Sequence, residues 1–123
     1  MRDDYPLFAH WYRTLDWILS AVEKFPKHAR FSLASRLAGG ALDTMELIIE
    51  AIYTRDRSHI LDRINLYIEK QRVLFRIAHD RAYIANHQYE YIAKALDEAG
   101  RMVGGWKKHG SGKMNNPTED EHA

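Results

Sequence analysis

Apolar residues recur every three or four positions along most of the chain, which is the spacing of one buried face of an α-helix. No stretch alternates apolar and polar residues as a half-buried β-strand would. The prolines, at positions 6, 26 and 117, leave the periodic runs uninterrupted. The pattern therefore predicts four helices, over about residues 6–24, 29 or 32–54, 58–81 and 86–106.

The ends of these predicted helices carry local signals. Pro6 occupies the place of a helix-start proline. Phe25-Pro26 ends the first helix, because the residue before a proline disfavours helical backbone. Ser58 and Asn86 are the expected N-caps of the third and fourth helices.

Short connections join the predicted helices, so consecutive helices should lie side by side and antiparallel. We therefore predict an all-α fold, an up-down-up-down antiparallel four-helix bundle, over residues 1–108. The following residues, 109–123, are polar and rich in Gly, Ser and Asn, and we expect a disordered tail there. A length of 123 residues is that of one domain.

Two glycines stand near the end of the fourth predicted helix, where each costs about 1 kcal/mol relative to alanine. Gly100 and Gly104 are four positions apart and therefore share one helix face. We interpret this face as the inward one, with the glycines allowing the helix to pack closely against a neighbour.

Composition limits the classes of protein that the chain can represent. Hydrophobic residues make up 46% of it, which is typical of a globular protein. Cysteine is absent, so disulfides, thiolate metal sites and a cysteine nucleophile are excluded. No apolar run reaches about 18 residues, and no apolar segment with a cleavage site opens the chain. We therefore expect a cytoplasmic protein without a membrane partner.

Catalytic and metal-binding patterns are also missing from the sequence of the predicted bundle. Di-iron bundles use Glu-x-x-His pairs on facing helices, and the only such spacing here, Glu119 to His122, falls in the tail. No acid–base pair or nucleophile motif is present in the predicted helices. We expect no enzymatic activity, no cofactor and no metal.

Several large apolar residues point away from the main apolar stripes, and helices that are apolar on more than one side have more than one neighbour. Trp17 has three interpretations: part of a wide core, a subunit contact, or a surface on which a nucleobase stacks. Gln71, in contrast, projects onto the apolar stripe of its helix and is expected to be a hydrogen-bonded core amide. The off-stripe residues predict a homo-oligomer whose interface contains Trp17, Leu33, Leu47, Tyr91 and Met102.

Basic residues gather at the predicted connections, although the formal net charge is only +1. In an up-down bundle the connection between the second and third helices lies at the same end as the end of the fourth helix. Arg72 and Arg76 are four apart and either bridge to Glu69 or line a groove that contacts phosphates. The remaining cations are ordinary loop charge or parts of nucleic-acid-binding surfaces: Lys24, Lys27 and Arg30 at the first connection, and Arg55, Arg57, Arg101, Lys107 and Lys108 at or near the opposite end.

A resemblance to a known family is carried by four segments: EKFPK at 23–27, RFSL at 30–33, IEKQRVLFRIAHD at 68–80 and GRMVGGWK at 100–107. They resemble the accessory variability determinant (Avd) family, whose members assist the reverse transcriptases of diversity-generating retroelements. That family is similar in turn to four-helix proteins encoded within 23S rRNA intervening sequences. The resemblance covers about residues 5–108, and the last segment is its most specific part.

The resemblance implies a non-catalytic four-helix subunit of a barrel-like homopentamer. It also implies binding to the element's reverse transcriptase and to its template RNA, and to DNA as well, in support of mutagenic cDNA synthesis. Basic residues of the oligomer would carry the nucleic-acid contact. Two alternatives remain open: a four-helix RNA-associated protein of an rRNA intervening sequence, or an oligomeric scaffold for other proteins.

Overall fold

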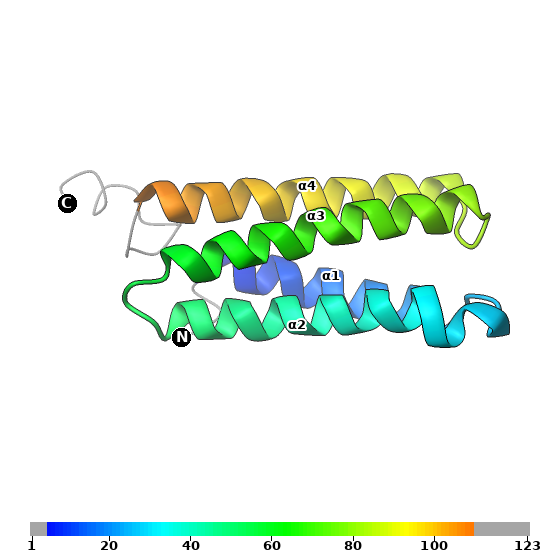
Figure 1. Ribbon diagram of the computed structural model, residues 1–123. Coiled ribbons are helices and arrows are strands. Elements are labelled where there is room, and N and C mark those ends of the chain that lie inside the picture. The colour runs from blue at the N-terminus through cyan, green and yellow to red at the C-terminus, as the bar shows by residue number, and fades with distance from the viewer. Residues whose placement is uncertain (1–4, 110–123) are drawn as a thin grey trace.

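The computed structural model describes residues 5–109, which form a bundle of four long helices (Figure 1). Two short helical segments, η2 and η3, precede the second long helix, η2 with 3-10 geometry and η3 with π geometry. No strand occurs in this range. The elements are α1 (Pro6–Val22), η2 (Lys27–Ala29), η3 (Arg30–Ala34), α2 (Ser35–Ile52), α3 (Ser58–Asp80) and α4 (Asn86–His109).

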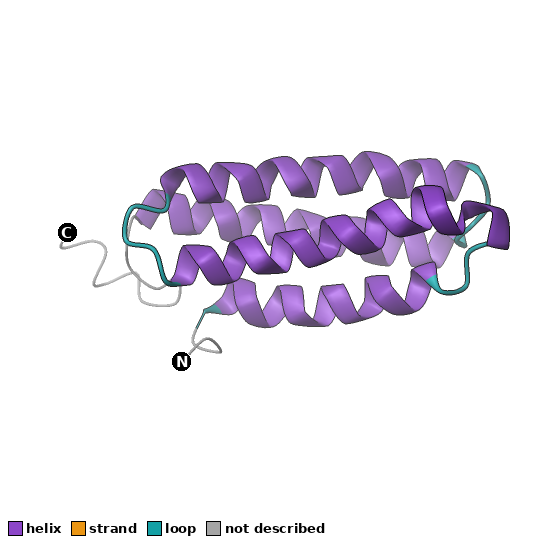
Figure 2. Ribbon diagram, turned by 60° about the horizontal axis from the view of Figure 1, so that its bottom comes forward, coloured by secondary structure: helices purple, strands orange, loops and turns teal. Residues whose placement is uncertain are grey.

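Each long helix packs against its neighbours in the chain, and α1 also packs against α4 (Figures 1 and 2). The helices therefore occupy the four corners of a closed up-down-up-down bundle, and the predicted fold class is confirmed. We call one end the Trp106 pole: it contains the start of α1, the connection 53–57 and the end of α4 (Figure 1). The opposite end, the Tyr83 pole, contains residues 23–34 and the connection 81–85.

All four helices contribute fully buried large side chains to a single core. Trp11 of α1 lies in it with no exposed surface, and its indole Nε1 donates a hydrogen bond of 3.0 Å to the carbonyl oxygen of Ala41 on α2. Burial of large apolar side chains is the main stabilising contribution to such a bundle. Further fully buried members are Leu7, Ile18, Leu37, Ile48, Ile64, Phe75, Ile92 and Trp106.

The amide side chain of Gln71, on α3, lies inside this core. Its Nε2 donates hydrogen bonds to Thr44 Oγ1 at 3.1 Å and to the carbonyl oxygen of Tyr67 at 3.0 Å. Thr44 in turn donates to the carbonyl oxygen of Gly40 at 2.7 Å. The expectation of a hydrogen-bonded core amide is confirmed, and the amide joins α3 to α2.

The start of two helices differs from the sequence prediction. Ser58 and Asn86 are the first residues of α3 and α4 rather than their N-caps. Arg57 precedes α3 and makes no capping hydrogen bond with its side chain. Before α4, the backbone N–H of Ala85 donates to Gln88 Oε1 at 2.8 Å, which replaces a cap by Asn86.

The inward-facing role expected of Gly100 and Gly104 is wrong. The buried line of α4 passes through Ala99, Val103 and Trp106, and it leaves Gly104 exposed. Beyond its chain neighbours and its own helix backbone, a Cβ placed on Gly104 would meet no described atom within 4 Å, and one on Gly100 would meet Arg72 Nη2 at 3.5 Å. Because Trp106 belongs to the core rather than to the helix end, the buried face is rotated away from the glycines.

Within residues 5–109, no helix is both long and apolar enough to cross a membrane. The tail expected to be disordered, 109–123, lies outside the described residues except for His109, which ends α4.

Candidate functional site

The Trp106 pole is organised around a buried tryptophan that contacts the second connection. Trp106 has no exposed surface, and Tyr5, just before α1, packs on it with 5.3 Å between ring centroids. The guanidinium carbon of Arg57 lies 5.0 Å from the centre of the indole ring. This cation–π contact fixes the connection 53–57 against the end of α4, so the two cationic segments meet as the sequence predicts.

Arg57 is nevertheless no exposed loop cation, and its assignment to a nucleic-acid surface is wrong. Only 8% of the residue is exposed. Its Nε and Nη1 are buried and, like Trp106 Nε1, have no hydrogen-bond partner among the described residues. The aromatic face attracts the guanidinium into the fold, so Arg57 shapes the pole rather than presenting a charge to a ligand.

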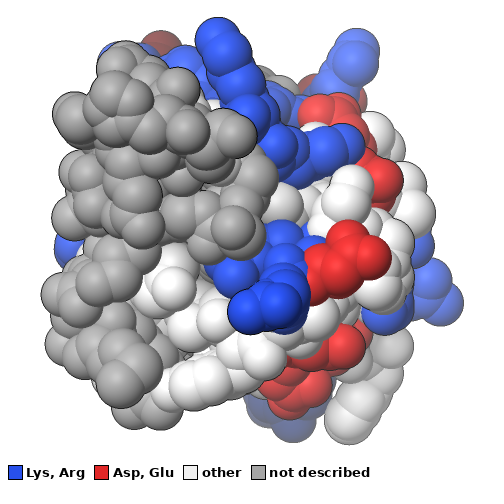
Figure 3. Space-filling view, turned by 90° about the vertical axis from the view of Figure 1, so that its left-hand side faces the viewer, with Lys and Arg blue, Asp and Glu red and all other residues white. Residues whose placement is uncertain are grey.

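The other cations of this pole are divided between paired and exposed ones. Lys107 forms an ion pair with Asp62 of α3. Arg55 and Lys108 are exposed. Figure 3 shows that lysine and arginine side chains on this face alternate with aspartate and glutamate. The pole is therefore a mixed surface in which Arg55 and Lys108 remain open to solvent.

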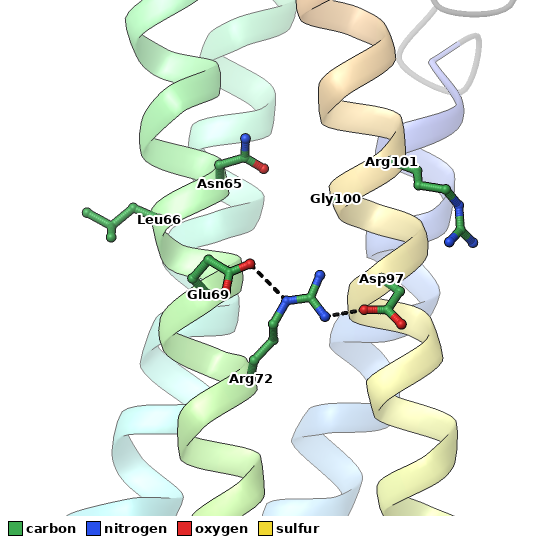
Figure 4. Close-up of a pocket in the computed structure, with 7 residues that line it drawn as sticks. All are labelled: Asn65, Leu66, Glu69, Arg72, Asp97, Gly100 and Arg101. Atoms are coloured by element: carbon green, nitrogen blue, oxygen red, sulfur yellow. Dashed lines mark hydrogen bonds and ion pairs between the residues drawn. The ribbon is translucent and has the colours of Figure 1, made fainter.

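A groove of about 550 Å³ runs between α3 and α4, beside Gly100 (Figure 4). Arg72 crosses it: Nε donates to Glu69 Oε1 at 3.0 Å, and Nη1 pairs with Asp97 of α4. The hydrogen bond to Asp97 raises the pKa of Arg72 above its ordinary value. Of the two interpretations of Arg72, bridging to Glu69 is the one observed.

Arg101 and Arg76 complete the cations of this side. Arg101 donates from Nε and Nη2 to Glu98 Oε2, at 3.2 and 2.5 Å. In Figure 4 its side chain points away from Arg72. Arg76 is exposed. The groove therefore carries balanced charge, and Arg76 is the cation of this group left to solvent.

The Tyr83 pole holds the first cationic cluster, in which Lys24, Lys27 and Arg30 are all exposed. Next to it, the Tyr83 hydroxyl accepts a hydrogen bond of 3.0 Å from Arg81 Nε and lies 3.1 Å from His28 Nε2. The hydrogen bond to Tyr83 raises the pKa of Arg81. The Phe25 ring packs on Tyr83 with 5.5 Å between centroids, so the tyrosine is fixed.

Sequence reasoning missed the part played by Arg81 and Tyr83. They belong to the short connection between the third and fourth helices. A basic and an aromatic residue two positions apart in that connection were the sequence signal for a binding surface there. The topology brings this connection beside residues 27–36, a contact between distant segments that sequence spacing alone does not indicate (Figure 1).

The residues predicted to form an oligomer interface are mostly used inside the subunit. Leu47 is only 6% exposed and belongs to the core, so its prediction as a subunit contact is wrong. Trp17 lies 6.3 Å from Phe75 and 5.0 Å from Tyr91 between ring centroids, which favours the wide-core interpretation. Leu33 and Met102 are partly buried against the core. Tyr91 is 48% exposed.

A different apolar surface lies on the outward face of α3. Leu66, Val73 and Ile77 are spaced seven and four apart and share one face. They are 53%, 58% and 40% exposed. We call these three residues the α3 stripe. The seven- and four-residue spacing is present in the sequence. It is hard to recognise there, because the same helix has many other apolar residues that form its buried face.

No cluster of three or more His, Asp or Glu side chains that could hold a metal ion occurs in the described part of the chain.

Fold and surface together define an all-α four-helix-bundle protein with exposed cations at both poles. The model of the bAvd-like family matches residues 8–110, and the chain belongs to this family. It is therefore an Avd-type accessory protein, as the resemblance implied. No curated protein matches the chain.

Proposed function

We propose that this protein is a non-catalytic, cytoplasmic subunit that assists a diversity-generating retroelement by binding its reverse transcriptase and its template RNA. The observation that carries the proposal is the family match, which spans nearly the whole bundle. Exposed cations at both poles support the RNA contact, because Lys and Arg bind phosphates with release of counterions.

The cations divide into two groups that make the RNA-binding proposal specific. Those committed to other groups are Arg57, buried on Trp106, and Arg72, Arg101 and Lys107, paired with carboxylates. We assign phosphate binding to the exposed group: Lys24, Lys27, Arg30, Arg55, Arg76 and Lys108. The same positive charge suits DNA, so cDNA is an additional ligand of this surface.

Self-association belongs to the same proposal, with a pentamer as the expected state. The α3 stripe, together with Tyr91, supplies exposed apolar surface for a subunit contact. An assembly would repeat the cationic poles several times. Multiple contacts on one RNA would then increase the apparent affinity without new interactions in any subunit.

The test of this function measures binding of the purified chain to the element's template RNA by fluorescence anisotropy over a range of salt concentrations. Replacing Lys24, Lys27 and Arg30 by Gln should lower the affinity. It should also reduce the slope of log K against log salt by about 2 to 3 per subunit engaged. The matched control replaces Arg72, Arg101 and Lys107 by Gln, which removes the same charge from paired positions and should change the slope less.

If the two triple variants reduced the RNA affinity and the salt slope equally, binding would depend on the total charge of the protein, and the assignment of phosphate binding to the exposed cations would be wrong. Absence of RNA binding by the wild type at low salt, with and without the reverse transcriptase, would contradict the proposed function. Co-purification of the reverse transcriptase with the tagged wild-type chain after nuclease treatment tests the protein contact separately.

A further inference from the structure

Phe31 is the most exposed large hydrophobic residue among those described, at 88%. It lies on η3, a π-helical turn of five residues between η2 and α2. A π turn adds a residue to the helical turn and changes which side chains face the core, and such turns occur frequently at functional sites. The local backbone thus turns a phenylalanine outward at the Tyr83 pole.

Beside Phe31 is a pocket of about 520 Å³, which is within the range of small-ligand sites. Leu33 provides apolar surface, and Tyr83 provides a second aromatic wall held by its contacts with Phe25 and Arg81. Arg36 and Arg81 supply cations to the same pocket.

The charged side chains among the described residues that line this pocket are Arg36 and Arg81, both basic. None of the described residues that line it is acidic. Lys27 and Arg30, both exposed, lie in the adjoining turns η2 and η3, and Arg30 lines a neighbouring pocket that also contains Glu23. This contrasts with the groove between α3 and α4, where Arg72 is matched by Glu69 and Asp97. The pocket therefore combines an exposed aromatic ring with uncompensated positive charge.

We propose that this pocket binds an unpaired base of single-stranded nucleic acid. The base stacks on Phe31, and the neighbouring phosphates contact Arg36 and Arg81, with Lys27 and Arg30 along the same strand. Single-strand-binding proteins combine an aromatic surface with a positive groove in this way. The inference rests on the proposed RNA binding and adds to it the chemical group that is recognised.

A nucleobase fits these observations better than a protein partner does. Arg and aromatic residues are common at protein interfaces too, but the described lining of this pocket contains two arginines and no acidic residue, which suits the phosphates of a nucleic acid. Stacking needs one accessible aromatic face, and phosphates need cations within a few ångströms of it. The pocket offers both.

The experiment compares a fluorescein-labelled 12-nucleotide oligouridylate with a 12-base-pair RNA duplex by anisotropy. Phe31→Ala should weaken binding of the single strand by about 5- to 150-fold, the range for loss of one base–aromatic stack. Binding of the duplex should stay the same, because its bases are paired and stacked. Phe31→Trp should retain single-strand binding, since it keeps an aromatic face.

Tyr12→Ala is the matched control: it removes another exposed aromatic, 62% accessible, from α1. It should change neither affinity. Arg36→Gln with Arg81→Gln should weaken both RNAs and reduce the salt slope by about 1 to 2. An unchanged single-strand affinity in Phe31→Ala, or an equal loss for both RNAs, would overturn the base-binding pocket.

Two further measurements separate this inference from the proposed function and from a protein contact. Titration of the full chain with uridine 5′-monophosphate, followed by amide NMR, should shift resonances of residues 28–36 and 77–83 even if the element's RNA does not bind. If those shifts are absent and Phe31→Ala leaves the single-strand affinity unchanged, the base-binding pocket is refuted, although RNA binding through other cations can still hold.

Light scattering of Phe31→Ala should give the wild-type mass. A lower mass would make Phe31 a subunit contact and would also refute the proposal.

Discussion

At the scale of single residues, Gln71 shows how a polar side chain becomes part of a core. It is 1% exposed, and its Nε2 finds two acceptors, while its Oε1 is buried and has no partner among the described residues. A buried amide with an unmade hydrogen bond is costly, whereas a made one contributes about 1 kcal/mol net. The stability of this site therefore depends on Thr44, which accepts one of the two bonds.

Thr44→Val should lower the free energy of unfolding by about 1–3 kcal/mol, because it leaves part of the Gln71 amide without an acceptor. Adding Gln71→Leu should recover much of that loss, since both polar partners are then replaced by apolar groups. Urea unfolding at one fixed protein concentration measures both, with Ser20→Ala, an exposed position of α1, as the control. Simple additivity of the two changes would show that the side chains are not coupled.

At the scale of the helix, the register of α4 decides what its glycines do. The last buried residues, Ala99, Val103 and Trp106, are spaced four and three apart. Gly100 and Gly104 follow this line by one position each, which turns them by about 100° toward solvent. Their flat face is thus an outer surface beside the groove that Arg72 crosses.

Gly104→Ala should raise the free energy of unfolding by up to about 1 kcal/mol, which is the helix-propensity difference at an exposed interior position. Beyond the chain neighbours and the helix's own backbone, no described atom lies within 4 Å of the added Cβ, so no clash opposes the gain. Thermal or urea unfolding measures the change, and Gly39→Ala on α2, equally free of contacts, is the parallel case. A loss of stability would mean that a second chain packs on this face.

The helices and their order follow from the sequence because apolar spacing and short connections leave few alternatives. Finer details did not follow. Leu47 was assigned to an interface, since a stripe alone does not say how wide the buried face is in a helix with two neighbours. The sequence predicts Arg57 to be a loop charge or part of a nucleic-acid-binding surface, because only the folded chain brings it onto Trp106. Exposed Phe31 depends on a π turn that has no reliable sequence signal.

At the scale of the whole molecule, the bundle leaves an apolar face of α3 without a partner among the described residues of the subunit. The α3 stripe lies opposite the buried face of α3, and its three residues are each at least 40% exposed. An apolar strip flanked by charged residues is typical of a surface that meets another protein. A second copy of the chain is the partner that our proposed assembly supplies.

Val73→Lys should therefore shift the particle mass toward that of the 14.4 kDa subunit, measured by light scattering at micromolar concentration. A lysine in the stripe would have to bury its charge on assembly, which is unfavourable. Tyr53→Lys, at an exposed position in the second connection, is the control and should leave the mass unchanged. A wild-type mass for Val73→Lys would place the contact elsewhere.

The ring contact between Tyr5 and Trp106 joins the two ends of the described chain. Chain ends usually fray, each on its own and at little cost. Here, loosening the last turn of α4 removes the support of the segment that leads into α1, and releases Arg57 from its aromatic face as well. The first turn of α1 and the last turn of α4 therefore form one cooperative unit of local unfolding, so that a change at one end of the described range destabilises the other.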